Sequence, residues 1–488
     1  MAERTREVVV VGCGIGGLAA AVAALEGGAS VTILERAPED ERGGQTRYTE
    51  AYLRMKSETE VTDDFEDFLA RNASGAIDPA LVALTGRPEQ DRPAVAKGLS
   101  LFEPDVIATF AEEAPPTIAW MKRFGLRFEA LPTQFLTRSQ PRLLPVGGGA
   151  ALVEALATAA EKAGATFLYQ ATASALDVDD AGTVRGLHYR DRDGRLAHIA
   201  ADAVVLACGG FQGNAEMMAQ YVGPRASHLR PVARGGYFNK GEGIRMAFEA
   251  GAAPCGDFGD YHAEPVDPRS GIAEPSVFIF SYGILVNTLG HRFVDEAPTT
   301  VDACYERITR TIFQQPGGLA WCILDARHLD IPNYRLGLRT DQPPVVADTV
   351  EELADRIEVD AEALAATLVA YNGACRAAEG APYKPLELDG LATAGIRPVK
   401  SNWAHPVNRP PFHAYPIISS NVFTYGGLKV DSHARVLDHD GRPLAGLYAA
   451  GEIIGSYYRN YPGGTSVLKG AVFGRQAGRH ATGQHGNA

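Results

Sequence analysis

A glycine-rich turn near the N-terminus constrains the fold more than any other feature of the chain. It lies between a β-branched run and an alanine-rich run, and its glycines are Gly12, Gly14 and Gly17. This order predicts a strand over residues 7–11, a tight turn and a buried helix over residues 17–26. A second strand is expected over residues 30–35. Two parallel strands joined by a helix are the opening unit of an α/β sheet.

The spacing of these glycines also predicts a dinucleotide site. The pattern Gly-x-Gly-x-x-Gly allows the turn, lets the backbone approach a pyrophosphate, and packs the helix on the strand. The positive end of the helix then faces the phosphates. Glu35 closes the second strand at the distance where an acid accepts hydrogen bonds from a ribose diol. Because strand, turn, helix, strand and acid occur in order, we favour this interpretation over a glycine-rich turn that binds nothing.

Three later segments favour FAD over NAD as the dinucleotide. They cover residues 42–46, 204–210 and 446–452. An extended FAD offers adenine, pyrophosphate, ribitol and ring, so distant segments must return to it. Residues 463–468 predict a helix start whose amides could stabilise negative charge on a reduced flavin. The residues predicted to bind FAD are Gly12, Gly14, Gly17, Glu35, Arg36, Gly43, Gly44, Thr46, Ala173, Gly210, Glu452, Ser466 and Leu468.

Composition excludes several other classes of protein. The formal net charge of −13 argues against nucleic acid or an anionic membrane as the main partner, because both need a basic surface. The six cysteines form no CxxC pair, which disfavours a metal site, an iron–sulfur cluster or a disulfide framework. We therefore expect a cytoplasmic protein. Residues 8–25 carry no charge, but their glycines predict a strand and helix rather than a membrane span.

The length of 488 residues suggests roughly two or three domains. From about Cys255 the composition of the chain changes, and segments with aromatic residues and prolines that are typical of loops become frequent. We predict an α/β fold in which a Rossmann-type FAD-binding domain, residues 1–254 and 409–488, is interrupted by an α+β capping domain over residues 255–408.

The sequence also predicts individual elements in both domains. These are a helix over 147–163, strands over 165–169, 203–207 and 278–286, a hairpin turning at Asp193-Gly194, a capping box from Thr349 to Glu352, and a helix over 360–375.

At this point the chain resembles a known superfamily over essentially its whole length. The glycine turn, Gly43-Gly44, residues 290–296 (GHRFVDE) and Gly451-Glu452 are similar to the flavoproteins of fumarate reductases and succinate dehydrogenases. Residues 400–404, 423–431 and 460–464 most resemble FAD-dependent tricarballylate dehydrogenases, and Tyr461-Pro462-Gly463 also resembles ketosteroid dehydrogenases. The resemblance implies that the cap covers the flavin ring and that the substrate is held between them.

Departures from the superfamily pattern sharpen the expectation. Where fumarate reductases carry a catalytic arginine shortly after GxRFxxE, this chain reads Ala297 to Asp302 without one, which weighs against fumarate itself as a substrate for reduction. No histidine stands beside Gly43-Gly44, so we expect noncovalent FAD. Without a haem-binding CxxCH motif or cluster cysteines, electrons must pass to an external acceptor: a quinone, a partner redox protein or oxygen.

Desaturation beside a carbonyl or carboxylate needs a base, a hydride acceptor and stabilisation of enolate-like charge. The resemblance implies that Tyr461 and the Gly464 amide hold the substrate oxygen, and that Tyr305 is the acid/base. Tyr305 is otherwise a packing tyrosine. Arg459 is a carboxylate clamp or a surface arginine, and His262 contacts substrate or is structural. Weaker candidates for positive charge near the site are Arg47, Lys56, Arg138 and Arg142.

The sequence therefore leaves three hypotheses about function open. The first is a dehydrogenase (desaturase) acting on a small polycarboxylate or cyclic keto compound. The second is an enoate or enone reductase, and the third is a non-catalytic flavoprotein electron relay. Converging arginines would favour a polycarboxylate, whereas an apolar slot lined by tyrosines would favour a ketone. Candidates for such a slot are Tyr282, Tyr425, Tyr457 and Tyr458.

Overall fold

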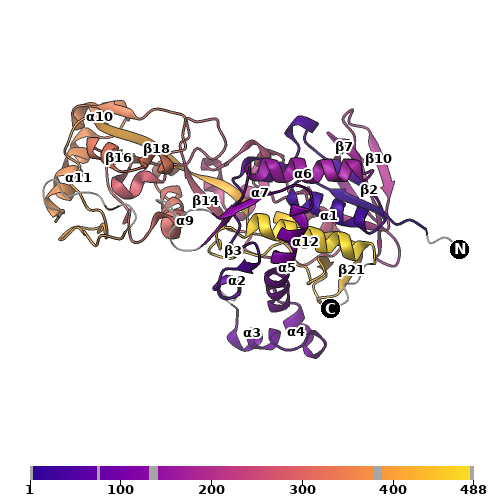
Figure 1. Ribbon diagram of the computed structural model, residues 1–488. Helices are drawn as coiled ribbons and strands as arrows, with labels where there is room; N and C mark the ends of the chain where they lie inside the picture. The colour runs from indigo at the N-terminus through magenta and orange to yellow at the C-terminus, as the bar shows by residue number, and fades with distance from the viewer. Residues whose placement is uncertain (1–3, 74–76, 131–140, 377–383, 385–386, 484–488) are drawn as a thin grey trace.

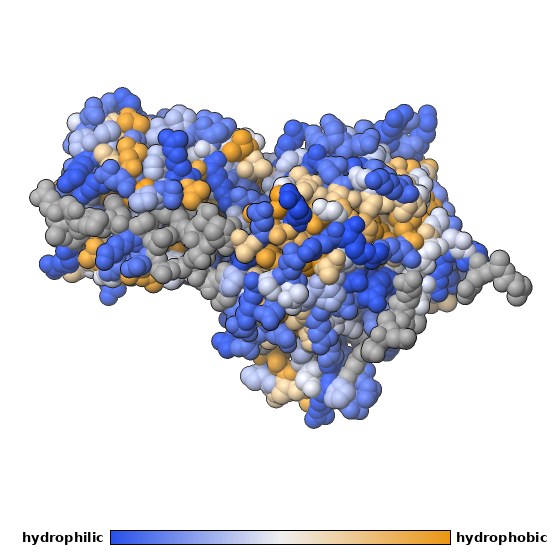
Figure 2. All heavy atoms as spheres, in the orientation of Figure 1, coloured by the Kyte–Doolittle hydropathy of each residue, from blue (hydrophilic) through white to orange (hydrophobic). Residues whose placement is uncertain are grey.

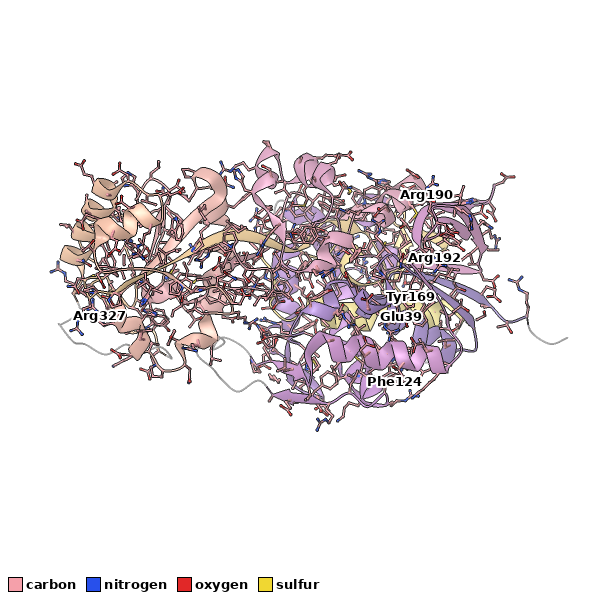
Figure 3. All side chains as sticks on the ribbon, turned by 90° about the horizontal axis from the view of Figure 1, so that it is seen from above. Glu39, Phe124, Tyr169, Arg190, Arg192 and Arg327 are labelled. Carbon is pink, nitrogen blue, oxygen red and sulfur yellow. The ribbon has the colours of Figure 1, made fainter. Side chains whose placement is uncertain are left out.

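The computed structural model describes residues 4–73, 77–130, 141–376, 384 and 387–483. Figure 1 shows two lobes side by side, with the N-terminus on the larger lobe and helices α9, α10 and α11 in the other. Helices α2, α3 and α4 extend from the larger lobe. From above, Tyr169 and Arg190 lie in the larger lobe and Arg327 lies in the second (Figure 3).

The larger lobe is built on a six-stranded sheet of order β20-β21-β11-β1-β2-β7. Its strands are β1 (Glu7–Val11), β2 (Ser30–Glu35), β7 (Thr166–Tyr169), β11 (Ala203–Leu206), β20 (Arg435–Leu437) and β21 (Pro443–Ala449). All neighbouring pairs are parallel except β20 with β21. The strand pairing thus brings the C-terminal part of the chain beside the N-terminal unit, and the predicted α/β class is confirmed.

Helices cover this sheet, and two of them pack closely on each other through glycines. They include α1 (Ile15–Glu26), α6 (Gly148–Lys162) and α12 (Ser466–Ala481). A Cβ at Gly474 or Gly478 of α12 would lie 2.2 Å from a backbone oxygen of α1. The two helices can therefore pack closely only with glycine at these positions. Figure 2 shows apolar residues gathered on the larger lobe between α6 and α12.

Further elements of the larger lobe follow the same chain order. The predicted hairpin is confirmed as β9 (Val184–Arg190) with β10 (Leu196–Ala200), and β8 (Thr172–Val178) pairs with β9. The helices are α2 (Phe65–Ala73), α3 (Pro79–Thr85), α4 (Ala94–Lys97), α5 (Pro104–Lys122), α7 (Ala215–Tyr221) and α8 (Glu242–Glu249). Short strands are β3 (Met55–Ser57), β4 (Glu60–Val61), β5 (Phe128–Ala130), β6 (Leu143–Pro145), β13 (Pro254–Cys255) and β19 (Gly427–Leu428).

The second lobe is built on a sheet around one long strand, β18 (Phe412–Thr424). Its partners are β12 (Arg230–Pro231), β14 (Tyr261–Val266), β16 (Leu319–Leu324) and β17 (Val345–Ala347), and β15 (Ile284–Asn287) pairs with β16. Helices α9 (Val301–Phe313), α10 (Val350–Arg356) and α11 (Ala361–Ala374) pack on it over two apolar clusters. Because β18 pairs within this sheet to Thr424, the strand pairing favours a boundary later than residue 408. The domain boundaries themselves stay a prediction.

Two local predictions need correction. Residues 278–283 are not strand: a 3₁₀ turn covers Ile279–Tyr282, and only β15 is extended. A short apolar run does not distinguish the two by its periodicity. The capping box is half formed, since Thr349 Oγ1 accepts from the Glu352 amide at 3.1 Å but Glu352 accepts from Asp348. The helix after Asp360 is confirmed as α11, capped by the Asp360 carboxylate.

Within the described ranges, no helix is both long enough and apolar enough to cross a membrane.

Candidate active site

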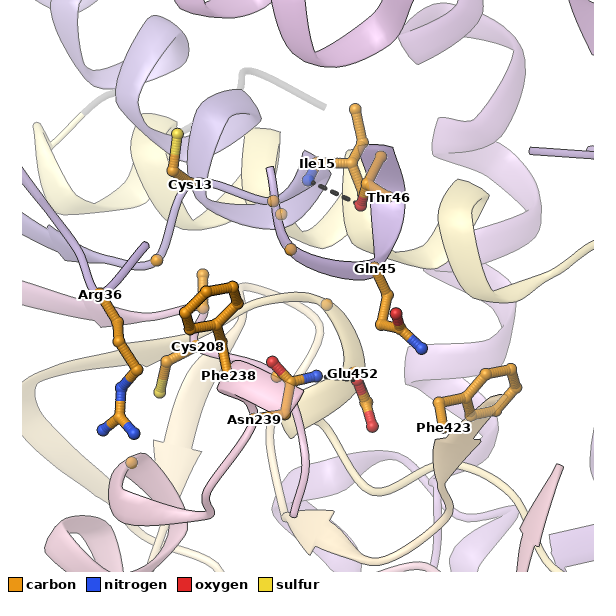
Figure 4. A pocket seen from close by; sticks show the side chains of 18 of the residues that line it. Cys13, Ile15, Arg36, Gln45, Thr46, Cys208, Phe238, Asn239, Phe423 and Glu452 are labelled. Carbon is orange, nitrogen blue, oxygen red and sulfur yellow. Dashed lines mark hydrogen bonds between the residues drawn. The ribbon is translucent and has the colours of Figure 1, made fainter. Parts of the chain in front are cut away.

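The glycine turn borders an open cavity (Figure 4). It runs past the ends of β1 and β2 to the start of α12. Nine of the residues predicted to bind FAD line it: Gly12, Gly14, Glu35, Arg36, Gly44, Thr46, Ala173, Glu452 and Ser466. The other four, Gly17, Gly43, Gly210 and Leu468, do not line this cavity.

The three glycines of the turn serve different purposes. A Cβ at Gly17 would lie 1.9 Å from the Gly12 oxygen, and one at Gly12 would lie 2.4 Å from the Ala207 oxygen. These two glycines therefore permit close packing of backbone. A Cβ at Gly14 would meet protein atoms only at 3.5 Å or more, so this position opens onto the cavity. It leaves room for a ligand to approach the N-terminus of α1.

Glu35 lies at the end of β2, where it is 6% exposed. Its Oε2 accepts from the Cys13 amide at 3.0 Å, and its Oε1 accepts from the Ala37 amide at 2.8 Å. Burial raises the pKa of this carboxyl, and the amides partly oppose the rise. Each carboxylate oxygen has a second lone pair, so the group can still accept from a ribose diol.

Glu452 forms the opposite wall of the cavity. Its carboxylate accepts from the Thr424 amide at 3.0 Å and from the Asn239 side chain at 3.1 Å. A Cβ at Gly210 would lie 2.3 Å from Glu452 Oε1, so Gly210 lets this carboxylate approach the backbone rather than facing the cavity. Gly43 has φ 112° and Leu468 is fully buried, so both support the residues that line the cavity without lining it themselves.

The residues present fit FAD. Gly14 leaves an open cradle, acidic Glu35 stands at the end of the second strand, and the buried Gln45 Oε1 at the cavity has no hydrogen-bond partner among the described residues. Such an orphaned acceptor calls for a donor from a ligand. Glu35, Thr46, Glu452 and Ser466, with the amides of the glycine turn, are the residues that would hold the cofactor.

A second cavity adjoins the first. The residues common to both linings are Thr49, Glu274, Val422, Phe423, Ser466 and Val467. Four of the five predicted catalytic residues line the second cavity: His262, Tyr305, Tyr461 and Gly464. Its walls come from both lobes, since β14 and α9 provide two of these residues and the segment before α12 provides the others.

Tyr305 and His262 are hydrogen-bonded to each other, with 2.7 Å between the hydroxyl and Nε2. Burial, followed by the nearby Arg310 charge, lowers the pKa of His262 to about 3. Burial and then the neighbouring Glu306 carboxylate raise the pKa of Tyr305. The resting pair is therefore a neutral imidazole that accepts from a phenol. His262 Nδ1 is buried and has no partner among the described residues.

Tyr461 closes the N-terminus of α12. Its hydroxyl oxygen accepts from the amides of Gly464 at 3.1 Å, Thr465 at 3.0 Å and Ser466 at 3.0 Å, and it donates to Ser466 Oγ. The Gly464 amide thus points to the Tyr461 hydroxyl in this structure. Tyr461 and Gly464 lie together as the sequence predicts, and their role toward substrate stays a prediction.

Of the arginines named from the sequence, the weaker candidate Arg142 lines the second cavity and Arg459 does not. Arg142 lines the second cavity, and its guanidinium donates to the Pro141 oxygen at 3.1 Å. Arg339 also lines it, but its guanidinium already holds Glu50 at 2.8 Å and Glu274 at 3.2 Å. Arg459 is exposed, at φ 52°, and lies outside the lining of both cavities.

Two other weaker candidates, Arg47 and Lys56, line neither cavity. Arg47 pairs with Glu154 at 2.6 Å and Lys56 pairs with the exposed Asp63. Arg138 falls outside the described residues. Of the four tyrosines proposed for a ketone slot, only Tyr457 lines a cavity. Tyr458 instead accepts from the Gly256 amide at 2.9 Å.

Two buried carboxyls also face the second cavity. Burial raises the pKa of Glu264, whose Oε1 accepts from Ser276 Oγ. Burial and then Glu264 raise the pKa of Glu274 to about 8. Sequence reasoning missed both, together with Lys469 and Asn239 in the first cavity, because no motif marks them. Among the described residues no cluster of three potential ligands could hold a metal ion.

The mostly parallel sheet, the glycine turn and the cavity beside that turn define a dinucleotide-binding protein. The family model described as "FAD binding domain" matches residues 7–468. The chain belongs to this family. FAD as cofactor, the superfamily and an FAD-dependent oxidoreductase activity are thereby confirmed.

Relatives and solved structures agree with this assignment. A probable fumarate reductase of Shewanella frigidimarina is 27% identical over 98% of this chain and 75% of its own length. A 3-oxosteroid 1-dehydrogenase of Mycobacterium tuberculosis is 30% identical over 70% of this chain and 64% of its own length. A flavocytochrome c3 fumarate reductase structure matches with a TM-score of 0.73 at 25% identity, covering 99% of this chain and 79% of that one.

Proposed function

We propose that this protein is an FAD-dependent dehydrogenase that forms a double bond between adjacent carbons next to a carboxylate or carbonyl of a small substrate. The observation that carries the proposal is the Tyr305–His262 hydrogen bond of 2.7 Å in a cavity joined to the FAD cavity. Removal of a proton and a hydride from neighbouring carbons needs a base beside the hydride acceptor. Tyr305 and His262 are the proposed source of this base, since both line the cavity that adjoins the FAD cavity.

FAD, when bound, supplies the hydride acceptor. Tyr305 takes the α-proton of the substrate while its own proton passes to His262 Nε2. A phenol of ordinary pKa is too weakly ionised to act alone at neutral pH. The hydrogen bond to a neutral imidazole provides the relay that such a phenol needs. His262 is available for this because burial keeps its resting ring unprotonated.

Charge that develops on the substrate oxygen is stabilised from the α12 side. In the resting site the Tyr461 hydroxyl gives its one proton to Ser466 Oγ and accepts from the Gly464, Thr465 and Ser466 amides. For a role toward substrate, that proton must turn from Ser466 Oγ to the substrate oxygen, and the Gly464 amide must turn from the hydroxyl to the same oxygen. Tyr461 and the Gly464 amide are the proposed oxyanion donors. The positive end of α12 adds to their effect.

Arg142 supports a small carboxylate over a cyclic ketone. It is buried and lines the cavity. Its side chain lies beside Gly464, where an added Cβ would come within 3.1 Å of it. An arginine fork with no acidic partner among the described residues of the cavity is suited to a carboxylate. A polycarboxylate is therefore the favoured substrate class, with electrons leaving to a quinone, a redox protein or oxygen. The cytoplasmic location stays a prediction.

The same groups can run the reaction in reverse, as an enoate or enone reductase. Relatives named as reductases favour this second candidate, among them a vinyl phenol reductase of Lactiplantibacillus plantarum, 25% identical over 97% of this chain. The missing arginine after Glu296 weighs against it for fumarate. A relay without catalysis has no need of the second cavity with its polar lining.

Anaerobic mixing of the purified holoprotein with substrates tests the proposal. The panel contains succinate, tricarballylate and a cyclic 3-ketone, each with its unsaturated counterpart. Bleaching of the flavin band by a saturated carboxylate supports the dehydrogenase. Reoxidation of photoreduced protein by an unsaturated acid, without bleaching by its saturated form, supports the reductase. A flavin band that changes with neither class contradicts both.

A further inference from the structure

Three lysines of this chain are fully buried: Lys400, Lys429 and Lys469, at 0%, 1% and 1% exposure. Burying an ammonium group costs several kcal/mol unless a partner offsets the loss of water. Lys429 has such a partner in Glu103, at 2.9 Å. Lys469 donates instead to two neutral groups, the Ile454 oxygen at 2.8 Å and Ser456 Oγ at 2.7 Å. Its burial therefore calls for an explanation in function.

Lys469 lies in the first turns of α12 and lines the FAD cavity. Ser466, three positions earlier, is on the same side of the helix. Ser466 and its neighbour Val467 line both cavities, so this part of α12 borders the junction where the redox ring must meet the substrate. The Lys469 ammonium also lies 4.7 Å from the centre of the Tyr457 ring, another residue of the FAD cavity.

From this placement we propose that Lys469 sets the reduction potential of the bound FAD, by supplying the positive charge that compensates its reduction. The proposal rests on FAD binding and not on the choice of substrate. Reduction brings two electrons and one proton to the ring and leaves one negative charge there. Lys469 then holds a second proton taken from solvent, so the site gains two electrons and two protons without net charge.

The groups around Lys469 allow this proton uptake. Burial lowers the pKa of Lys469 to about 7, against the opposing effects of Glu452 and Cys255. Burial raises the pKa of both Glu452 and Cys255, so neither fully offsets the ammonium charge. The Tyr457 ring faces it with its π cloud, and burial raises the pKa of the Tyr457 hydroxyl. A negative charge arriving in the cavity therefore favours protonated Lys469.

The test is the midpoint potential of the holoprotein, measured against a reference dye during slow reduction by xanthine and xanthine oxidase. The variants are Lys469→Met, Lys469→Arg and, as a matched control, Lys400→Met. Lys400 is an equally buried ammonium in the second lobe, bound to the Ser281 and Gly283 oxygens. Each variant is first checked for bound flavin by its absorbance spectrum.

In Lys469→Met we expect the potential to fall by roughly 30–60 mV, a tenfold to hundredfold loss of preference for reduced FAD. Lys400→Met should leave the potential unchanged. In the wild type the potential should steepen above about pH 7, from about 30 toward about 60 mV per pH unit, as Lys469 begins to take up a proton. Lys469→Arg should keep the high potential without steepening, because arginine stays charged.

An unchanged potential in Lys469→Met, or an equal fall in Lys400→Met, overturns the proposal. Should Lys469→Met fail to retain flavin, the Lys469→Arg variant decides, because a steepening above about pH 7 that persists in it also overturns the proposal. None of these outcomes depends on turnover, so they are independent of whether the dehydrogenase proposal holds.

Discussion

The Tyr305 hydroxyl and His262 Nε2 lie 2.7 Å apart although one belongs to α9 and the other to β14. The ring of His262 also packs against Phe423 and Tyr461, with centroids 5.0 and 4.5 Å away, and those two rings contact each other. The dyad is thus placed by packing from several segments of the chain. Its geometry is prepared before any substrate arrives, as a proton relay requires.

Substitution of Tyr305 by Phe should remove the proposed base while keeping the ring that packs against Phe278. We expect kcat to fall by roughly 10²–10⁴ with KM little changed, the range typical of general acid–base catalysis. Rapid-mixing measurement of flavin reduction checks this. A variant that reduces its flavin at the wild-type rate would rule out Tyr305 as the base.

His262 should also make folding stability depend on pH. Its pKa is about 3 in the folded chain and about 6.5 when unfolded, so the unfolded chain binds the proton first. This contribution to stability is complete above the unfolded pKa and is lost as pH falls below it toward the folded pKa. Between pH 6.5 and 5 the wild type should lose about 2 kcal/mol relative to His262→Gln. Denaturant unfolding of both proteins across this pH range measures the difference, and parallel pH curves would contradict it.

Arg142 should govern affinity for carboxylate substrates. Replacing it with Gln leaves a shorter neutral side chain in the cavity, and we expect KM to rise roughly 10- to 100-fold, the loss of a charge-assisted hydrogen bond pair. Arg459→Gln is the matched control, because Arg459 is exposed and outside both cavities. An equal rise in KM for the two variants, or a larger rise for Arg459→Gln, would contradict Arg142 as the carboxylate clamp.

A substitution at Gly14 should weaken FAD binding without disturbing the fold. A Cβ there would meet no protein atom closer than 3.5 Å, yet it would enter the FAD cavity. Gly14→Ala should therefore fold normally and bind FAD at least about tenfold more weakly. Gly373→Ala, in α11 with no atom within 4 Å of its Cβ, is a control expected to bind FAD normally and to gain about 0.5–1 kcal/mol in stability. Fluorescence titration of the apoproteins with FAD measures the binding and denaturant unfolding measures the stability.

Sequence reasoning succeeded where chemistry follows from local backbone geometry. The turn from Gly12 to Gly17 and the acid Glu35 are separated by one strand–helix–strand unit, so their spacing alone places them together. Tyr305 and Tyr461 were reached through resemblance and His262 through its place at the start of the predicted cap, and all three line one cavity. Glycines were harder to assign, because Gly17 and Gly210 serve packing while Gly14 faces the cavity, and composition does not distinguish these uses.

The arginine clamp was only partly predictable, because the sequence named Arg142 as a weaker candidate and preferred Arg459. Arg459 adjoins Asn460 and Tyr461 in the chain, but its positive φ lies in a segment that carries the side chain to the surface. Arg142 is distant from Gly464 in sequence and reaches it only through the tertiary fold. Side-chain direction in such loops depends on tertiary contacts that periodicity does not encode. Buried Lys469 likewise looks like an ordinary helix lysine until its surroundings are known.

Glu306 connects the two sides of the active site and provides the last prediction. Its Oε1 accepts from Arg310 at 2.9 Å and from the Tyr425 hydroxyl, and its Oε2 accepts from the Tyr461 amide at 3.3 Å. Arg310 in turn pairs with Asp260, next to β14. One buried carboxylate therefore ties α9, which carries Tyr305, to the loop that carries Tyr461.

Glu306→Ala should cost about 1–3 kcal/mol of stability, because the partly buried Arg310 loses one of its two carboxylate partners and keeps Asp260. Glu306→Gln keeps an acceptor oxygen and should cost less, while loosening the Tyr461 loop. For this variant we expect kcat to fall by about tenfold at unchanged flavin content, since Tyr461 is displaced from the proton dyad. Stability from denaturant unfolding and kcat from steady-state assays separate the two effects. Full activity in Glu306→Gln would restrict Glu306 to a structural role, because a positioning residue must change turnover when its charge is removed.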